Sequence, residues 1–345
     1  MWTLLAKFFA SNKTSASATA KHAPVEFDVP IDMPPVQWRA DSAFPVPRGQ
    51  AFRSALQAKE LVQTPYWRAL FQTWFIALAP GLQAHSAYAP KGFRSAWREN
   101  YLVLSPLDER STELLAKSCA RAARRICRAL PELAQVNSDG ALPIIIFPDA
   151  DTYEHYATYL HLTDAGEVAQ DHIASAGMFV RSDDDALPKS EVQSFGYFMV
   201  LADEIGDAEP TLVHEMTHAL LSHLNLPLWI NEGIATMMEG TVESPSRDPA
   251  FVINRRAELL SRHRQFWDEQ TTPTFWDGLA FNNGASSELA YDMAFRIVFE
   301  LARDLPSFSA FAKSADPTDG GNAAAMAIYG FPVEALLEAH LQLPS

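Results

Sequence analysis

Two histidines four residues apart, with a glutamate directly after the first, are the residues in this 345-residue chain that most clearly suggest chemistry. They are His214, Glu215 and His218, in the segment His-Glu-Met-Thr-His. On an α-helix, positions i and i+4 lie one turn apart on the same face, so both imidazoles can reach one metal ion. Zinc accepts such nitrogens, and a glutamate beside the first ligand is held near the metal without binding it. A general base that acts on a metal-activated water must lie there.

A third ligand is needed, because two histidines leave a zinc site too open. Glu232, in the segment Trp-Ile-Asn-Glu-Gly-Ile-Ala, follows His218 by 14 residues. This spacing leaves room for the first helix to end, for a turn at 225–227, and for an antiparallel helix whose first turn faces the metal. Two histidines, one glutamate and one open position describe a catalytic rather than a structural site. The sequence therefore predicts one Zn²⁺ per chain.

The helix that must present these histidines has recognisable ends. Asp207 is expected at the N-cap, and Pro210 suits the first turn. Asn225 and Pro227 are expected to stop the helix. His223 follows His218 by five residues and so points away from the metal face, which favours a surface position.

The pattern H-E-x-x-H followed by W-x-N-E-G-x-A resembles the gluzincin metallopeptidases, and more closely their compact peptidase MA-like bacterial members. The resemblance is sharpest over residues 195–240 and extends loosely over about 97–345. It implies that the zinc ligands are His214, His218 and Glu232 and that the general base is Glu215.

The resemblance also bears on residues outside this pattern. Many gluzincins stabilise the oxyanion with a tyrosine from their later helical half, which points to Tyr291 here; a core or rim tyrosine is the alternative. Thermolysin-type relatives carry an acidic residue four positions after the glutamate ligand, where it orients a histidine, but this chain has Thr236. The orienting group must come from elsewhere, and Glu239 and Asp292 are the candidates.

Strand patterns precede helical patterns along the chain. Strands are expected at 101–104, 142–147, 178–180 and 195–201, with a helix from Asp108 to Pro131 and another ending at Leu160. After Leu201 the pattern is helical, at about 208–224, 230–239, 250–267, 286–304, 306–314, 322–329 and 333–342. This order predicts an α+β fold: a small mixed sheet with helices, then the zinc-binding helix and an all-helical C-terminal half, as in gluzincins.

The strand at 195–201 has two interpretations. By the resemblance it corresponds to an edge strand that pairs with an extended peptide substrate, and main-chain pairing of that kind gives affinity without reading side chains. The alternative is an ordinary interior strand.

Composition divides the chain into four parts. Residues 1–49 are rich in Pro, Ser and Ala and are expected to form a flexible arm. Residues 50–96 are expected to form a helical extension, with helices at 50–63 and 65–79 and a loop over 80–97. The α/β subdomain at 97–240 carries the H-E-x-x-H helix and the glutamate ligand, and 241–345 forms a helical subdomain.

The excess of acidic side chains limits the kinds of partner that we expect for this chain. With 42 acidic against 27 basic side chains, the net charge is −15, which argues against sequence-independent binding to nucleic acid or to anionic membranes. A local basic patch is compatible with this balance. No run of about 20 apolar residues exists, so no membrane span is expected. We expect a cytoplasmic chain; Ala18-Thr19-Ala20 matches an A-x-A cleavage site, so a secreted or periplasmic chain is the alternative.

These features predict a zinc-dependent peptide hydrolase that acts on a peptide or protein substrate, with Glu215 as the general base of a metal-activated water. The main alternative is a zinc protein with little or no turnover that serves as a binding module. A structural metal site is a further alternative, and it requires a closed four-ligand shell.

Overall fold

The computed structural model describes residues 94–136, 142–147, 149, 153, 177–182, 195–202, 205–241, 249–282 and 284–342. The expected arm at 1–49, the helices expected at 50–63 and 65–79, and most of the helix expected to end at Leu160 lie outside these residues. The described chain mixes α-helices and β-strands, as expected. It divides into two compact units, residues 1–120 with 137–212 and residues 121–136 with 213–345.

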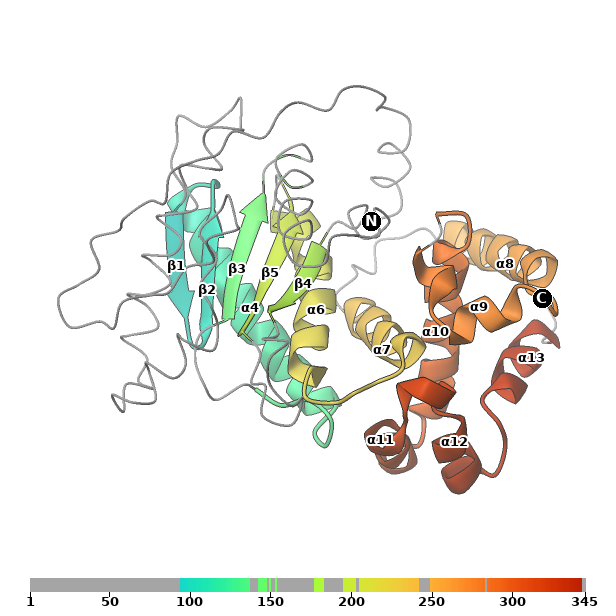
Figure 1. The fold of residues 1–345 in the computed structure, drawn as a ribbon. Coiled ribbons are helices and arrows are strands. Elements are labelled where there is room, and N and C mark those ends of the chain that lie inside the picture. Colours follow the sequence, from blue (N-terminus) through green and yellow to red (C-terminus); the bar gives the residue numbers. More distant parts are fainter. Residues whose placement is uncertain are drawn as a thin grey trace, which may run out of the picture. The chain divides into compact units, whose positions relative to one another are not determined.

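The first unit contains a five-stranded sheet in the order β1-β2-β3-β5-β4 (Figure 1). β2, β3 and β5 run parallel, whereas β1 and β4 are antiparallel to their neighbours. Ile144, Ile145 and Ile146 are all fully buried, although successive side chains of a strand point to opposite faces. Both faces of β3 are therefore covered, which is usual for strands of a parallel sheet and explains their apolar sequence. The strands are Arg94–Arg98 (β1), Tyr101–Ser105 (β2), Leu142–Phe147 (β3), Gly177–Ser182 (β4) and Phe195–Leu201 (β5).

β1 was not predicted, because the sequence favoured a loop as far as residue 97. Its five residues include two arginines and no β-branched side chain, so intrinsic strand preference is weak. Pairing with β2 supplies what local preference lacks. Arg94 also donates from Nη1 to the carbonyl of Leu107 over 2.7 Å. The polar composition is typical of an edge strand.

β5 is an interior strand, which confirms the second of its two interpretations. It pairs in parallel with β3 on one side and antiparallel with β4 on the other. Because both of its edges are already paired, β5 cannot add an extended peptide to the sheet, and the edge-strand expectation for 195–201 is wrong.

α4 spans Glu109–Ala129 and begins where the sequence predicts. The Asp108 carboxylate accepts a hydrogen bond from the backbone N–H of Ser111 over 3.0 Å, which satisfies a donor that the first turn leaves unpaired. Leu115, Cys119 and Ile126 form its fully buried face.

α6 spans Ile205–Leu221 and carries the two histidines. It begins earlier than predicted, so Asp207 lies in its first turn rather than at the N-cap, and Pro210 lies in the second turn. The helix also ends at Leu221, before Asn225. His223 is exposed beyond this end, as expected.

After β5, the elements of the described residues are all helical. Three short elements, α9, η2 and η3, were not predicted, because three to five residues carry too little periodicity to recognise. The remaining helices lie within a few residues of the expected bounds. The helical elements that follow α6 are α7 (Leu228–Glu239), α8 (Pro249–Phe266), α9 (Thr272–Trp276), η2 (Leu279–Asn282), α10 (Ser287–Leu301), α11 (Leu305–Ser314), η3 (Pro317–Asp319), α12 (Asn322–Tyr329) and α13 (Glu334–Gln342).

α7 and α10 pack closely in the second unit. They approach closely at Gly233, where an added Cβ would lie 2.6 Å from the backbone oxygen of Ala294 and 2.6 Å from Cγ2 of Val298. No side chain fits there, so glycine lets the two helix backbones meet. Trp229, earlier on α7, is fully buried and donates from Nε1 to the carbonyl of Gly320 over 2.9 Å.

No helix in the described part of the chain has both the length and the apolarity to cross a lipid bilayer.

Candidate metal centre

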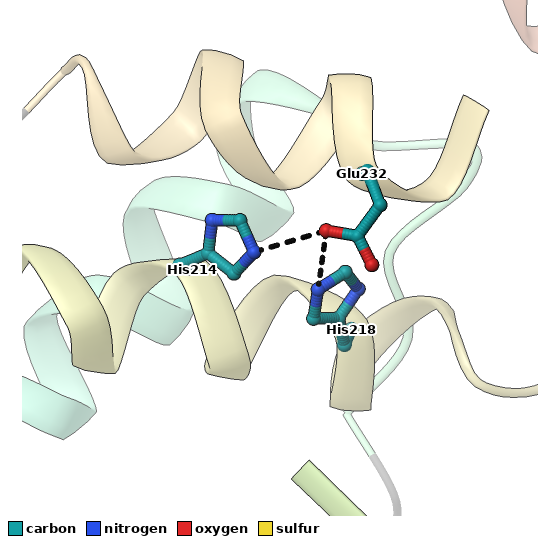
Figure 2. Close-up of side chains that lie close together, drawn as sticks. All are labelled: His214, His218 and Glu232. Atoms are coloured by element: carbon teal, nitrogen blue, oxygen red, sulfur yellow. Dashed lines mark hydrogen bonds and ion pairs between the residues drawn. The ribbon is translucent and has the colours of Figure 1, made fainter. Parts of the chain in front are cut away.

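Three predicted side chains come together in the second unit, on α6 and α7. Nε2 of His214 lies 3.2 Å and Nε2 of His218 lies 3.4 Å from the same oxygen, Oε2 of Glu232. Figure 2 shows both imidazoles directed at this oxygen, with the carboxylate reaching down from the neighbouring helix. One potential ligand atom from each residue lies within 4.8 Å of the others. The group can therefore hold a metal ion.

Two of the three separations between these atoms are close to those of a tetrahedral zinc site. Ligand atoms about 2.1 Å from a zinc ion are separated from one another by about 3.4 Å in a tetrahedron. The two measured nitrogen-to-oxygen separations are 3.2 and 3.4 Å. The imidazoles are edge-on to each other, with ring centroids 4.8 Å apart, as expected for side chains one turn apart on a helix.

Glu239 lies where it can orient the His214 ring. Its Oε2 lies 3.2 Å from Nδ1 of His214, the ring nitrogen on the far side from Glu232. Glu239 follows Glu232 by seven residues, which is two helical turns, so both carboxylates lie on the same face of α7. A carboxylate on the second nitrogen of a ligating histidine fixes its tautomer and its ring orientation.

The other candidates for this role lie elsewhere. The Thr236 hydroxyl is buried and has no hydrogen-bond partner among the described residues. Asp292 pairs with another histidine: its Oδ2 lies 2.8 Å from Nε2 of His263 on α8. His263 was not singled out from the sequence. Its pairing with Asp292 joins segments 29 residues apart, which no local pattern reveals.

Glu215 and Tyr291 lie close enough to the group to influence it. Glu215 is 7% exposed, and its charge contributes to raising the pKa of both histidines. The Tyr291 ring on α10 is 6.2 Å from the His214 ring, centroid to centroid. The predicted catalytic residues and the three predicted ligands therefore occupy one region of the second unit.

The charges and hydrogen bonds of His214, His218 and Glu232 shift one another's pKa values. Burial lowers the pKa of His214, but the hydrogen bonds that the imidazole donates to Glu232 and Glu239 outweigh this and raise the pKa well above 6.5. Burial raises the pKa of Glu232, but the charge of His218 and the hydrogen bond of His214 hold it well below its usual value. Burial and the neighbouring carboxylates raise the pKa of Tyr291 well above 10. Without metal, the imidazoles are thus favoured in their protonated form, and a cation can replace those protons.

Comparison with known proteins adds no assignment. No family model matches the chain. No curated protein matches its sequence.

Proposed function

We propose that the chain is a zinc-dependent peptide hydrolase of the gluzincin type. The observation that carries the proposal is the convergence of Nε2 of His214 and Nε2 of His218 on one oxygen of Glu232. Two imidazole nitrogens, one carboxylate oxygen and an open position form the ligand set of catalytic zinc sites. The adjacent Glu215 supports a catalytic rather than a structural role, because a structural site needs no base.

Each residue has a distinct task in this proposal. When bound, zinc supplies the Lewis acidity that activates water and polarises the scissile carbonyl. Glu215 takes a proton from the attacking water and passes it to the leaving amine, which needs a carboxylate beside the metal but not on it. Tyr291 donates its phenolic hydrogen to the oxyanion that develops on the carbonyl oxygen. Glu239 holds His214 in position through Nδ1.

The first test is the metal content of the purified full chain by elemental analysis. We expect about one zinc per chain in the wild type and in Glu215→Gln, and a clear loss in Glu232→Ala. His223→Ala is the matched control, because this histidine is exposed and lies beyond the end of α6. Absence of zinc from the wild type after loading would overturn the proposed ligand set.

The second test separates an enzyme from a binding module. Zinc-loaded wild type and Glu215→Gln are incubated with a mixed peptide library, and cleavage is followed by mass spectrometry. We expect cleavage by the wild type and a near-complete loss in Glu215→Gln at equal zinc content. Equal cleavage by both proteins contradicts the role of Glu215. Zinc binding without any cleavage favours the alternative of a peptidase-like binding module.

A further inference from the structure

α10 is anchored on α8 by two carboxylates that lie on either side of Tyr291 in the sequence. Glu288 accepts hydrogen bonds from Arg255 and, over 2.6 Å, from Nη1 of Arg262. Asp292 contacts Nε2 of His263 over 2.8 Å. We call these five residues the α8–α10 clamp: Arg255, Arg262 and His263 of α8 with Glu288 and Asp292 of α10.

The Asp292 half of the clamp has a fixed hydrogen-bond pattern. His263 is fully buried, and its Nδ1 lies 2.8 Å from Nε1 of Trp267. An indole N–H can only donate, so Nδ1 must accept, and the imidazole proton is on Nε2. It is therefore donated to Asp292, whose same oxygen also accepts from Nε of Arg296 over 2.5 Å. The Asp292 carboxylate therefore accepts hydrogen bonds from two directions, and neither of its two partners can act as the acceptor in these bonds.

Helix geometry relates the clamp to the phenol. At about 100° per residue, Glu288 and Asp292 lie about 40° apart around α10, and Tyr291 lies about 80° from the middle of that face. The clamp therefore holds one face of α10 while the tyrosine leaves from the adjacent one. That side chain lies beside the His214 ring.

We propose that the α8–α10 clamp sets the rotation of α10 about its own axis and thereby positions the Tyr291 hydroxyl at the metal centre. The proposal rests on the proposed function for the part played by Tyr291. α10 also packs extensively on α7 and meets its backbone at Gly233. The clamp adds to this packing polar contacts one turn apart, which oppose rolling of α10 about its axis.

A small rotation of α10 about its axis produces a large displacement of the Tyr291 hydroxyl. The phenolic oxygen of a helical tyrosine lies about 9 Å from the helix axis, so a roll of about 10° displaces it by about 1.5 Å. Misplacement by about 1 Å can cost about 100-fold in rate. Glu288 and Asp292 are thus positioning residues, which act through Tyr291 without touching substrate.

The kinetic test is a double-mutant cycle in the full-length, zinc-loaded chain. We expect Asp292→Asn to lower kcat about tenfold, less than loss of the phenol in Tyr291→Phe, with KM and zinc content unchanged. In the Tyr291→Phe background, Asp292→Asn should change kcat by less than about twofold. Glu300→Gln is the matched control, since Glu300 is a more exposed carboxylate of α10 that pairs with nearby Arg303. An equal loss in both backgrounds would overturn the proposal.

A spectroscopic test needs neither metal nor activity. The metal-free chain is labelled with ¹³C at Cζ of tyrosine, and the Tyr291 resonance is identified by its absence in Tyr291→Phe. We expect Asp292→Asn to shift or broaden this resonance and Glu300→Gln to leave it in place. If Asp292→Asn does not fold, Glu288→Gln takes its place with the same expectation.

The two arms separate the two proposals. An unchanged Tyr291 resonance in the folded clamp variant overturns the positioning role, whatever the activity. A wild type that binds zinc and cleaves no peptide overturns the proposed function, while the resonance still decides whether the clamp positions the phenol.

Discussion

Replacing Gly233 by alanine probes the contact that brings the Glu232 helix against the Tyr291 helix. The new Cβ would lie 2.6 Å from the Ala294 oxygen, whereas ordinary van der Waals contact begins at 3.4 Å. The distance between these two atoms must therefore increase by about 0.8 Å. Neither obstacle moves aside easily, because Val298 is β-branched and fully buried and the Ala294 carbonyl belongs to the helix backbone. α7 and α10 must therefore separate locally.

The expected cost follows from two opposing effects. Overpacking of this kind costs about 1–3 kcal/mol. Alanine returns about 1 kcal/mol of helix propensity relative to glycine. Because the obstructing atoms include backbone, we expect the upper part of the range and a net loss of about 1–2 kcal/mol in the free energy of unfolding.

Urea unfolding followed by tryptophan fluorescence measures this loss, since the buried Trp229 lies on α7. Gly240→Ala is the matched control: its Cβ would lie 3.6 Å from the nearest atom, and its φ of −57° suits any residue. If the Gly233 variant is as stable as the Gly240 variant, the close approach of the two helices does not limit stability, and the reasoning fails. Zinc affinity should be retained, because the ligands lie on α6 and α7 rather than on α10.

Four further outcomes are expected. Glu239→Gln should weaken zinc binding about 10–100-fold in a chelator competition, because the amide orients His214 less well; unchanged affinity would remove that role. Trp229→Phe should cost about 2 kcal/mol or more in urea unfolding, since it leaves a cavity and an unpaired Gly320 carbonyl; an unchanged midpoint would contradict this. Zinc at about 100 times its dissociation constant should stabilise the chain by about 2.7 kcal/mol in thermal unfolding, and no shift would argue against a site in the folded state. Burial raises the pKa of Asp292, but the hydrogen bonds that it accepts from imidazole and guanidinium lower this pKa below 3.8 in the folded state. The ionised carboxylate therefore stabilises the fold fully above pH 3.8. This stabilisation is lost as the pH falls through the lower, folded-state pKa. The stability difference between wild type and Asp292→Asn should therefore shrink from pH 7 to pH 3, and a constant difference would refute the assignment.

Local sequence was sufficient for much of the metal centre. The placement of His214 and His218 on one face follows from helical periodicity alone, because residues four apart are always neighbours on a helix. The turn between them and Glu232 had the residues that end one helix and begin another. Strands such as Leu142–Phe147 and Phe195–Leu201 were predicted to the residue, because a short apolar run between polar segments has few other interpretations.

Other features depended on neighbours that lie far away along the chain. The interior position of β5 is set by β4, a partner on its second edge, and the apolar run of β5 is the same in either position. β1 exists because β2 pairs with it, although its own residues favour a loop. In each case the sequence specified a segment, and strand pairing specified where it lies.

The sequence by itself determined which chemical groups are available: the two imidazoles, the carboxylate that completes the group, and the second carboxylate beside them. Tertiary structure alone decided which of two acidic candidates orients His214, why Gly233 must be glycine, and that His263 faces Asp292. The physical reason is the distance along the sequence between the residues that interact. Ligand spacing within a helix is set by backbone hydrogen bonds over a few residues, whereas contacts between helices depend on packing that joins residues tens of positions apart.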